Sequence, residues 1–450
     1  MASLSSHVLN GHTSKLYPTF VRGSGCYVFD ESGTRYLDAV GGVGVVNIGH
    51  GVEEVVNAIS KQAHKLAFTY GGMADNPARK QLAEKLQQWA PSGMGETRSL
   101  FCSGGAEANE AALKLAYQYH WELGQRTRRK VIGRWQSYHG NTIATLSLGG
   151  RTSWRTMHSP LLLDFPHIAP PYCYRCPWGR TYPDCGLPCA TELRRMIQQE
   201  GPDSIAALIV EPVIGTSMSA VVPPGEYYPL MREICDDFEV LLIADEVLSG
   251  VGRTGAKWGI DHWNVSPDIL TASKGISGGY APLGAVVLSE KVWTAIASGS
   301  QRVMHSSTYG GNPLSCSAGL AVLEYIEKWD LVSRAGRMGE TLLRKLRDRL
   351  GKSAFVGDIR GKGLFVGLEI VSAKRTKAPF PVEWNVTNRI EEAAFERGLL
   401  VLGGVEGLID GSSGDHLELL PPYTIEDEQI DFIVVTLEEC IREVVSQLLN

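Results

Sequence analysis

The 450-residue chain lacks the features that mark several classes of protein. It has no run of about 18 apolar residues that could span a membrane, and its N-terminal stretch lacks the apolar core of a secretory signal. Basic residues are not in excess either, because 43 Lys and Arg stand against 49 Asp and Glu, for a formal charge of −6. We therefore expect a cytoplasmic protein that binds neither nucleic acid nor a membrane.

The cysteines do not form the pattern of a secreted disulfide framework, because their number, nine, is odd and they are spread through a large chain. Four of them cluster at Cys173, Cys176, Cys185 and Cys189, where a CxxC pair and a less regular second pair partly resemble a zinc knuckle. A proline-rich loop with free thiols is the alternative interpretation. We assign no metal ligand, and metal analysis of the purified protein would decide between the two.

The chain does contain enough apolar residues, 44% of the total, to bury a large core. From about residue 52 to residue 310, short apolar runs typical of strands alternate with helical stretches. The runs are "RSLFCS", "KVIGRWQ", "IAALIVEP", "VLLIADEV", "DILTAS" and "GAVVLS". This alternation predicts an α/β fold with a mainly parallel central sheet covered by helices.

The segments on either side of this alternation have a different character. The N-terminal segment has a hairpin signal around "DESG", and the C-terminal segment combines strand signals with long helical stretches. We predict a large ligand-binding domain over residues 52–325. A smaller α+β domain is predicted from the N-terminal segment 1–51 and the C-terminal segment 326–450.

Charged side chains follow three of the predicted strands, at Glu211, Asp245 and Lys274. Because ligands bind beyond the carboxyl ends of parallel strands, we expect these side chains to converge on one site. Taken singly, Asp245 could cap a helix and Lys274 could be a solvated surface residue. Their pairing, and the glycines around Lys274 in "SKGISGGYAPLGA", favour a site that packs closely around a ligand.

The stretch "LFCSGGAEANEAALKLA" predicts a strand, a turn of small residues and the start of a helix. Unpaired amides at Gly104, Gly105 and Ala106 would face an anion there, although similar turns cap many ordinary helices. Tyr138, in "SYHG", could lay its ring over a planar ligand or could be a core aromatic. An amine, a carboxylate and an anion cradle together are what pyridoxal phosphate requires.

These motifs, in this order, resemble the class III (ω-type) aminotransferases of pyridoxal-phosphate fold type I. The similarity covers nearly the whole chain and includes "YVFDESGTRYLDAVGG", "NIGH", "SGGAEANEAALK", "YHG", "VEP", "ADEVLSGVGRTG", "STYGGNP", "RGKGLFVGLE" and "GDHLELLPP". The resemblance implies pyridoxal 5'-phosphate as cofactor, with an amino donor and a 2-oxo acid acceptor such as pyruvate or 2-oxoglutarate. It also implies a homodimer with the active site at the subunit interface.

The resemblance further implies roles for single residues. Lys274 is the Schiff-base lysine that holds the cofactor as an internal aldimine, and Asp245 is the partner of the pyridine nitrogen. Tyr138 and Val247 cover the two faces of the ring, and Tyr17 lines the substrate pocket. The other implied cofactor-binding residues are Ser103, Gly104, Gly105, Ala106, His139, Glu211 and, reaching the phosphate of the neighbouring subunit, Thr308.

Some positions depart from the family pattern. Leu248 stands where many relatives have Gln, and Ala106 stands where Ser or Thr is frequent. Gly411 lies about where some amine transaminases carry a mobile carboxylate-binding arginine, so Arg360 or another arginine would have to substitute.

Other functions stay open from the sequence alone. A decarboxylating transaminase or a pyridoxal-phosphate-dependent lyase would use the same motifs, because the substrate bond held perpendicular to the ring selects the reaction. A non-catalytic zinc-bearing interaction protein is a different interpretation, against which the intact Lys274 and Asp245 argue. The donor is open among β- or ω-amino acids, simple amines and diamines.

Overall fold

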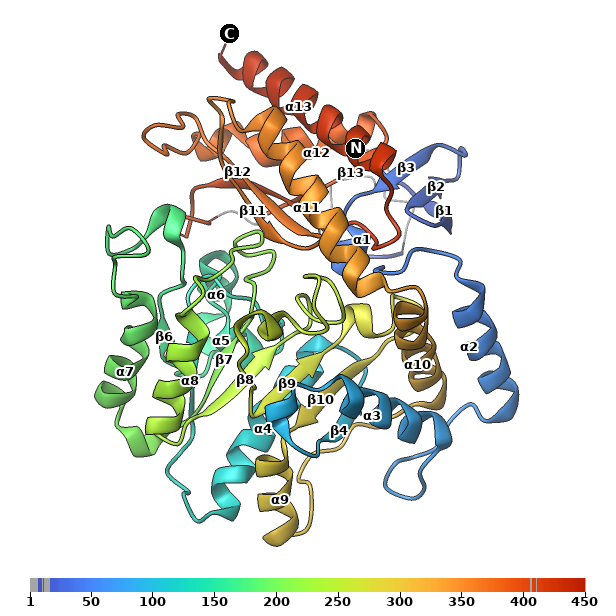
Figure 1. The fold of residues 1–450 in the computed structure, drawn as a ribbon, viewed down its shortest axis with the longest axis vertical. Helices are drawn as coiled ribbons and strands as arrows, with labels where there is room; N and C mark the ends of the chain where they lie inside the picture. Colours follow the sequence, from blue (N-terminus) through green and yellow to red (C-terminus); the bar gives the residue numbers. More distant parts are fainter. Residues whose placement is uncertain (1–6, 10, 12–16, 405–406, 410, 450) are drawn as a thin grey trace.

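The computed structural model describes residues 7–9, 11, 17–404, 407–409 and 411–449. Its strands form three sheets, one of seven strands and two of four. Figure 1 shows the large sheet and its helices in the lower part of the molecule and the two smaller sheets above them. Among the described residues, every helix is too short or too polar to serve as a membrane span.

The large sheet has the strand order β4-β10-β9-β8-β7-β5-β6. Its strands are β4 (Arg98–Cys102), β5 (Lys130–Arg134), β6 (His167–Ile168), β7 (Ile205–Val210), β8 (Leu241–Asp245), β9 (Ile269–Ala272) and β10 (Gly284–Leu288). Strands β5 to β9 pair in parallel, and only β10 runs antiparallel to its neighbours β4 and β9. The predicted α/β fold with a mainly parallel sheet is therefore confirmed.

Both faces of this sheet are buried, which explains the uninterrupted apolar sequences of its central strands. Along β7, Ala207 and Ile209 pack against α4 (Gly105–Glu122), while Leu208 and Val210 join the cluster that includes α8 (Tyr227–Asp237). The remaining helices around the sheet are α2 (Glu53–Lys65), α3 (Pro77–Trp89), α5 (Ile143–Leu148), α6 (Thr152–His158), α7 (Pro188–Glu200), α9 (Glu290–Ser298) and α10 (Pro313–Lys328).

The two smaller sheets bring the ends of the chain together. One has the order β1-β2-β3-β13, and its N-terminal strand β3 pairs in parallel with the C-terminal strand β13. The other has the order β11-β12-β15-β14. Their strands are β1 (Phe20–Ser24), β2 (Tyr27–Asp30), β3 (Arg35–Asp38), β11 (Val356–Lys362), β12 (Phe365–Ile370), β13 (Leu399–Leu400), β14 (Leu402–Gly403) and β15 (Asp415–Leu419).

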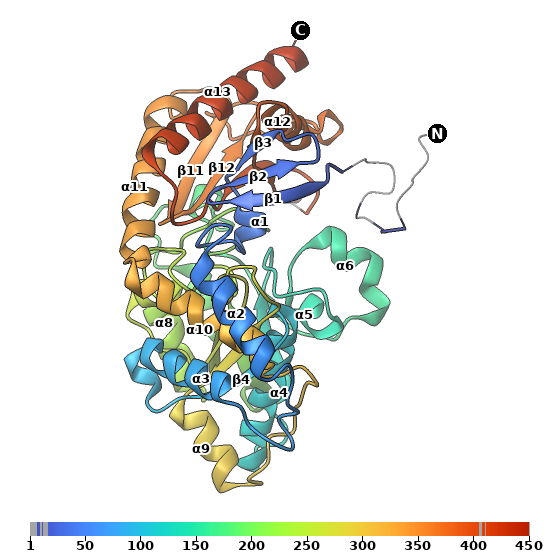
Figure 2. The same cartoon turned by 90° about the vertical axis from the view of Figure 1, so that its right-hand side faces the viewer.

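Long helices cover these sheets, and Figure 2 shows the N-terminal strands lying beside the C-terminal helices. The helices are α11 (Leu331–Leu350), α12 (Val386–Glu396) and α13 (Asp427–Leu449), and the short α1 (Gly41–Gly44) leads from β3 toward the large sheet. The domain limits 1–51, 52–325 and 326–450 stay a prediction.

The cysteine cluster lies between β6 and the start of α7. Cys173 is exposed, Cys185 and Cys189 are buried, and the Cys185 Sγ atom accepts a hydrogen bond from the Leu187 amide at 3.4 Å. The described part of the chain holds no group of three or more His, Cys, Asp or Glu side chains placed to bind a metal. The geometry therefore gives the zinc interpretation no support.

Candidate active site

The ends of three central strands meet at one cavity, as the fold rule predicts. Glu211 follows β7, Asp245 ends β8, and Lys274 begins the 3₁₀ turn η6 (Lys274–Ile276) after β9. All three line a cavity of about 320 Å³. Five more of the predicted site residues line it as well: Gly105, Ala106, Tyr138, His139 and Val247.

Four predicted residues do not line this cavity in the single chain. Ser103 and Gly104 lie just before α4, and the Ser103 amide donates a hydrogen bond to Glu107 Oε2 at 2.8 Å. Tyr17 and Thr308 are exposed. The residue before Thr308 in the chain, Ser307, lines a separate cavity of about 460 Å³. The roles of Tyr17 and Thr308 stay predictions.

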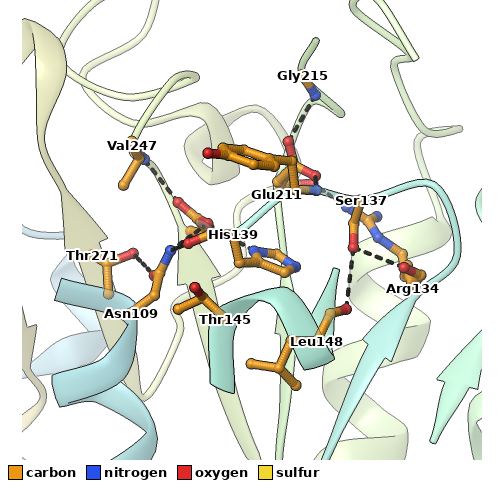
Figure 3. Close-up of polar contacts among 12 residues, drawn as sticks. Asn109, Arg134, Ser137, His139, Thr145, Leu148, Glu211, Gly215, Val247 and Thr271 are labelled. Atoms are coloured by element: carbon orange, nitrogen blue, oxygen red, sulfur yellow. Dashed lines mark hydrogen bonds and ion pairs between the residues drawn. The ribbon is translucent and has the colours of Figure 1, made fainter. Parts of the chain in front are cut away.

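The Asp245 carboxylate is buried and held by three N–H donors. Its Oδ2 atom accepts from Asn109 Nδ2 at 2.8 Å and from His139 Nδ1 at 2.7 Å, and its Oδ1 atom accepts from the Val247 amide at 3.1 Å. Thr271 Oγ1 donates in turn to Asn109 Oδ1, and Figure 3 shows these two residues side by side. The network fixes the position of a negative charge at the end of β8.

Lys274 has a strained backbone, because its φ of 47° lies in the left-handed region that non-glycine residues seldom adopt. Lys274 is half-buried, and part of it is accessible from the cavity that it lines. Burial lowers the pKa of this amine, and the nearby carboxylates of Glu418, Asp245 and Glu211 oppose that shift. A larger fraction of this amine is therefore neutral, which is the nucleophilic form, than in an ordinary lysine.

Glu211 supports the cavity wall and is not free to act on a ligand. Its Oε1 atom accepts from the Tyr138 amide at 3.0 Å, and its Oε2 atom accepts from the Gly215 amide at 2.8 Å (Figure 3). Burial, and secondarily the charge of Asp245, raises the pKa of this carboxyl group. Glu211 thus holds Tyr138 in place beside the cavity.

The first turn of α4 can hold an anion. Its N-cap residue Gly104 is extended, and no side chain caps the turn, so the backbone N–H groups at the helix start have no side-chain partner. Gly105 lets the start of α4 lie close to the cavity wall, because a Cβ atom there would lie 2.9 Å from Val247 Cγ1 and would force a shift. The departure at Ala106 therefore leaves the backbone amides as the donors.

The cavity as a whole fits pyridoxal phosphate. A carboxylate for a pyridinium nitrogen, an amine for an aldehyde and a helix start for a phosphate all border it, at Asp245, Lys274 and Gly105. The aromatic ring of Tyr138 and the apolar side chain of Val247 also line it and offer surfaces for a planar ring.

Several residues of the site were not predicted from the sequence. Asn109 lies one helical turn after Gly105, so the spacing of α4 was a signal that could have identified it. Arg151, Trp154 and Thr216 also line the cavity but lie in loops or at a short helix, where no periodic pattern marks them. Buried Glu418, on β15, lies close enough to Lys274 to affect its charge.

Two of the sequence departures can now be placed. Leu248 lines the cavity and offers no hydrogen-bonding side-chain atom. Arg360 does not line it, and its guanidinium instead bonds to the carbonyl groups of Met218 and Ser219 and to Asp358 and Glu369. This geometry gives no support to the suggestion that Arg360 takes over the binding of a substrate carboxylate.

Comparisons with known proteins show what the chain as a whole is similar to. A family model described as Aminotransferase class-III matches residues 10–441. The chain is 36% identical over 446 residues to the uncharacterized aminotransferase YodT of Bacillus subtilis, covering 99% of both chains. It is also 36% identical over 443 residues to a taurine–pyruvate aminotransferase of Bilophila wadsworthia, covering 97% of this chain and 95% of the relative.

Solved structures share the whole fold. An amine transaminase from an uncultivated Pseudomonas species, described in the PLP-bound (internal aldimine) form, has a TM-score of 0.91 and 36% identity, with 99% of both chains covered. An (S)-enantioselective omega-transaminase from Thermomicrobium roseum has a TM-score of 0.89 and 35% identity, covering 95% of this chain and 93% of its own.

Proposed function

Because this chain belongs to the class III aminotransferases, which depend on pyridoxal phosphate, we propose that it moves an amino group from an amine to a 2-oxo acid. The proposed donors are simple amines and β- or ω-amino acids, and the proposed acceptors are pyruvate and 2-oxoglutarate. One observation carries the proposal: the strained, half-buried Lys274 and the fixed carboxylate of Asp245 border the same cavity.

We propose that Lys274 Nζ holds the cofactor covalently and that Asp245 faces its ring nitrogen. The backbone N–H groups of Gly105 and Ala106 donate hydrogen bonds to its phosphate, and Tyr138 and Val247 cover the ring faces. When bound, pyridoxal phosphate supplies an electron sink for the negative charge left on the substrate carbon after a proton is removed.

Asp245 is suited to its role because hydrogen bonds fix the position of its carboxylate. Asn109 and His139 hold one carboxylate oxygen and the Val247 amide holds the other. A carboxylate fixed in a buried site stabilises a proton on a facing ring nitrogen much more strongly than a solvated carboxylate does.

Lys274 is suited to two tasks. Its lowered pKa favours the neutral amine, which would hold the bound cofactor and, when free, would move a proton from the substrate carbon to the next position. The lowered pKa supports both tasks, because each begins from the uncharged amine.

The test compares the Lys274→Ala variant with a control variant, Lys257→Ala. Lys257 lies outside the cavity and its amine lies over the ring of Trp89. We expect Lys274→Ala to lose amino transfer by roughly 10²- to 10⁴-fold or more, together with the visible absorbance of the bound cofactor. The control variant should keep both. Borohydride reduction of the native enzyme should label the peptide "TASKGIS".

Normal rates in Lys274→Ala, or a label on another peptide, would reject the assignment. Release of carbon dioxide or inorganic phosphate without amino transfer would instead favour a decarboxylating or lyase reaction on the same scaffold.

We also propose that the enzyme acts as a homodimer in the cytoplasm, with Thr308 completing the phosphate site of the neighbouring subunit. Tyr17 is proposed to line the substrate pocket. Thr308 is exposed and does not line the active-site cavity of its own chain, which supports this arrangement. Sedimentation measures the oligomeric state, and a monomer of full activity would contradict it.

A further inference from the structure

Arg151 is a buried arginine in the wall of the active-site cavity, and only 9% of its surface is exposed. It precedes α6, and two aromatic rings surround its guanidinium. The Cζ atom lies 4.6 Å from the ring centroid of Trp154 and 5.5 Å from that of Tyr138, and the two rings meet edge to face. These rings hold the plane of the guanidinium without using its N–H groups.

The guanidinium of Arg151 has no hydrogen-bond partner for its Nε and Nη2 atoms among the described residues, although both atoms are buried. These two atoms form one edge of the planar group, the edge that binds both oxygens of a carboxylate. A buried cation with an unpaired edge is costly unless a ligand completes it.

The neighbouring acids, Glu211 and Glu418, accept no hydrogen bond from the Nε and Nη2 atoms of Arg151. Both oxygens of Glu211 accept backbone N–H groups, at Tyr138 and Gly215. Glu418 is close enough to favour the charged form of Arg151, yet no ion pair joins the two within the described residues. Burial lowers the pKa of Arg151 to about 10, so the group stays cationic at neutral pH.

The other arginine considered at this site, Arg360, differs in this respect. Its N–H groups already bond to two carbonyl groups and two carboxylates outside the cavity. Arg151 therefore combines a cavity position with an unpaired edge, which Arg360 does not.

We propose that Arg151 binds the carboxylate of the substrate acid through its Nε and Nη2 atoms. The inference rests on the proposed amino transfer and adds the substrate class of that reaction. Acids are accepted because their carboxylate pairs with Arg151, whereas a substrate without an anionic group leaves Arg151 unpaired. Such a site discriminates strongly, because an analogue without the matching group leaves a buried donor without a partner.

The first experiment uses the holoenzyme with benzylamine as donor, whose product benzaldehyde differs from both acceptors, and compares pyruvate with propanal as acceptors. In Arg151→Gln we expect kcat/KM for pyruvate to fall about 10- to 100-fold, mainly through KM, while kcat/KM for propanal changes by less than about threefold. Arg151→Lys, which keeps the charge but lacks the fork, should fall in between.

The matched control is Arg155→Gln. Arg155 lies on α6 and donates to the carbonyl groups of Ser147 at 2.7 Å and Gly149 at 2.8 Å, and it does not line the cavity. Its loss should lower thermal stability and leave the ratio of pyruvate to propanal efficiency unchanged.

The second experiment needs no turnover. Calorimetric titration of the holoenzyme with propionate, ethanesulfonate and propanol measures whether the site binds an anion, and which one. Propionate should bind wild type and lose about 10- to 100-fold in affinity in Arg151→Gln, with propanol unaffected. Preference for ethanesulfonate over propionate would overturn the assignment to a carboxylate.

Other outcomes also overturn the inference. Equal losses for pyruvate and propanal, or a fall in cofactor content, would make Arg151 a residue of the fold or of the cofactor phosphate. If wild type transfers no amino group to either acceptor, the proposed function fails. The propionate titration then still tests Arg151 independently, and equal affinity in Arg151→Gln would reject its role.

Discussion

His139 donates a hydrogen bond from Nδ1 to Asp245 Oδ2 over 2.7 Å, and both side chains are buried. The bond fixes the tautomer of the histidine, because the carboxylate can only accept, and it leaves His139 Nε2 without a partner among the described residues. Asn109 holds the same oxygen and also the carbonyl group of His139. Asp245, His139 and Asn109 are therefore joined in one hydrogen-bonded network that fixes the position of the carboxylate.

Replacing Asp245 by Asn should lower kcat by roughly 10²- to 10⁴-fold while cofactor binding persists, because the buried negative charge that keeps the ring nitrogen protonated is lost. Steady-state kinetics and the visible absorbance of the bound cofactor are the measurements.

Glu246 provides the control for that substitution, because it is the neighbouring buried acid but serves the fold. Its carboxylate accepts from Ser249 Oγ at 2.6 Å and from the amides of Gly259 at 2.9 Å and Ile260 at 2.7 Å. Glu246→Gln should cost about 1–3 kcal/mol of stability and leave kcat nearly unchanged. Equal loss of kcat in both variants would contradict a separate role for Asp245.

The part of the site that could be predicted from the sequence follows from one physical rule. Glu211, Asp245 and Lys274 end or follow apolar runs, and parallel strands place such ends at one edge of the sheet. Neither Arg151 nor Glu418 obeys a comparable rule. Arg151 belongs to a loop that folds over the cavity, and Glu418 lies on a strand of a separate small sheet.

The fold shows the same limit. The burial of both faces of β7 and β8 made their continuous apolar sequences recognisable as parallel strands. The sequence of β10 does not indicate its direction, because "GAVVLS" is as apolar as the parallel strands yet runs antiparallel between β4 and β9. Pairing direction depends on the path of the connecting segments, which a local pattern does not contain.

Replacing Gly140 by Ala should disturb the cofactor cradle. Gly140 has a φ of 134°, and a Cβ atom there would lie 2.7 Å from both Ala106 Cβ and Thr145 Oγ1. Relief requires a shift of the first turn of α4, so we expect weaker cofactor binding and a stability loss of about 1–3 kcal/mol. Cofactor titration and thermal unfolding measure the two effects.

Gly225 is the matched position for this test, because a Cβ atom there would meet no atom within 4 Å and its φ is ordinary. Gly225→Ala should bind cofactor as wild type does. Unchanged cofactor affinity in Gly140→Ala would show that the cradle tolerates the shift.

Acid should destabilise the protein partly through His167. Its ring stacks on Trp135, its Nε2 atom bonds to the Leu148 carbonyl group, and burial lowers its pKa to about 4. A histidine in the unfolded chain titrates near about 6.5. The stabilisation by the neutral ring is therefore complete above that value and is lost as the pH falls from about 6.5 toward about 4.

His167→Gln can still donate to Leu148 but does not titrate, so its unfolding temperature should fall less than that of wild type between neutral pH and about pH 4. Exposed His158, replaced by Gln, serves as the control and should leave the slope as in wild type. Identical slopes in wild type and His167→Gln would contradict this account.

Removal of the cofactor should lower thermal stability. Without it, the buried groups that border the cavity, among them the Lys274 amine and the fixed Asp245 carboxylate, lack the ligand that would neutralise or pair them. A ligand that binds only the folded state at 100 times its Kd stabilises that state by about 2.7 kcal/mol. For a protein of this size we expect the unfolding temperature to drop by about 3 °C on cofactor removal and to recover on its return. The Lys274→Ala variant, which cannot hold the cofactor covalently, should gain much less from added cofactor, as scanning calorimetry would measure. An equal gain in that variant would mean that the phosphate cradle alone supplies the binding energy.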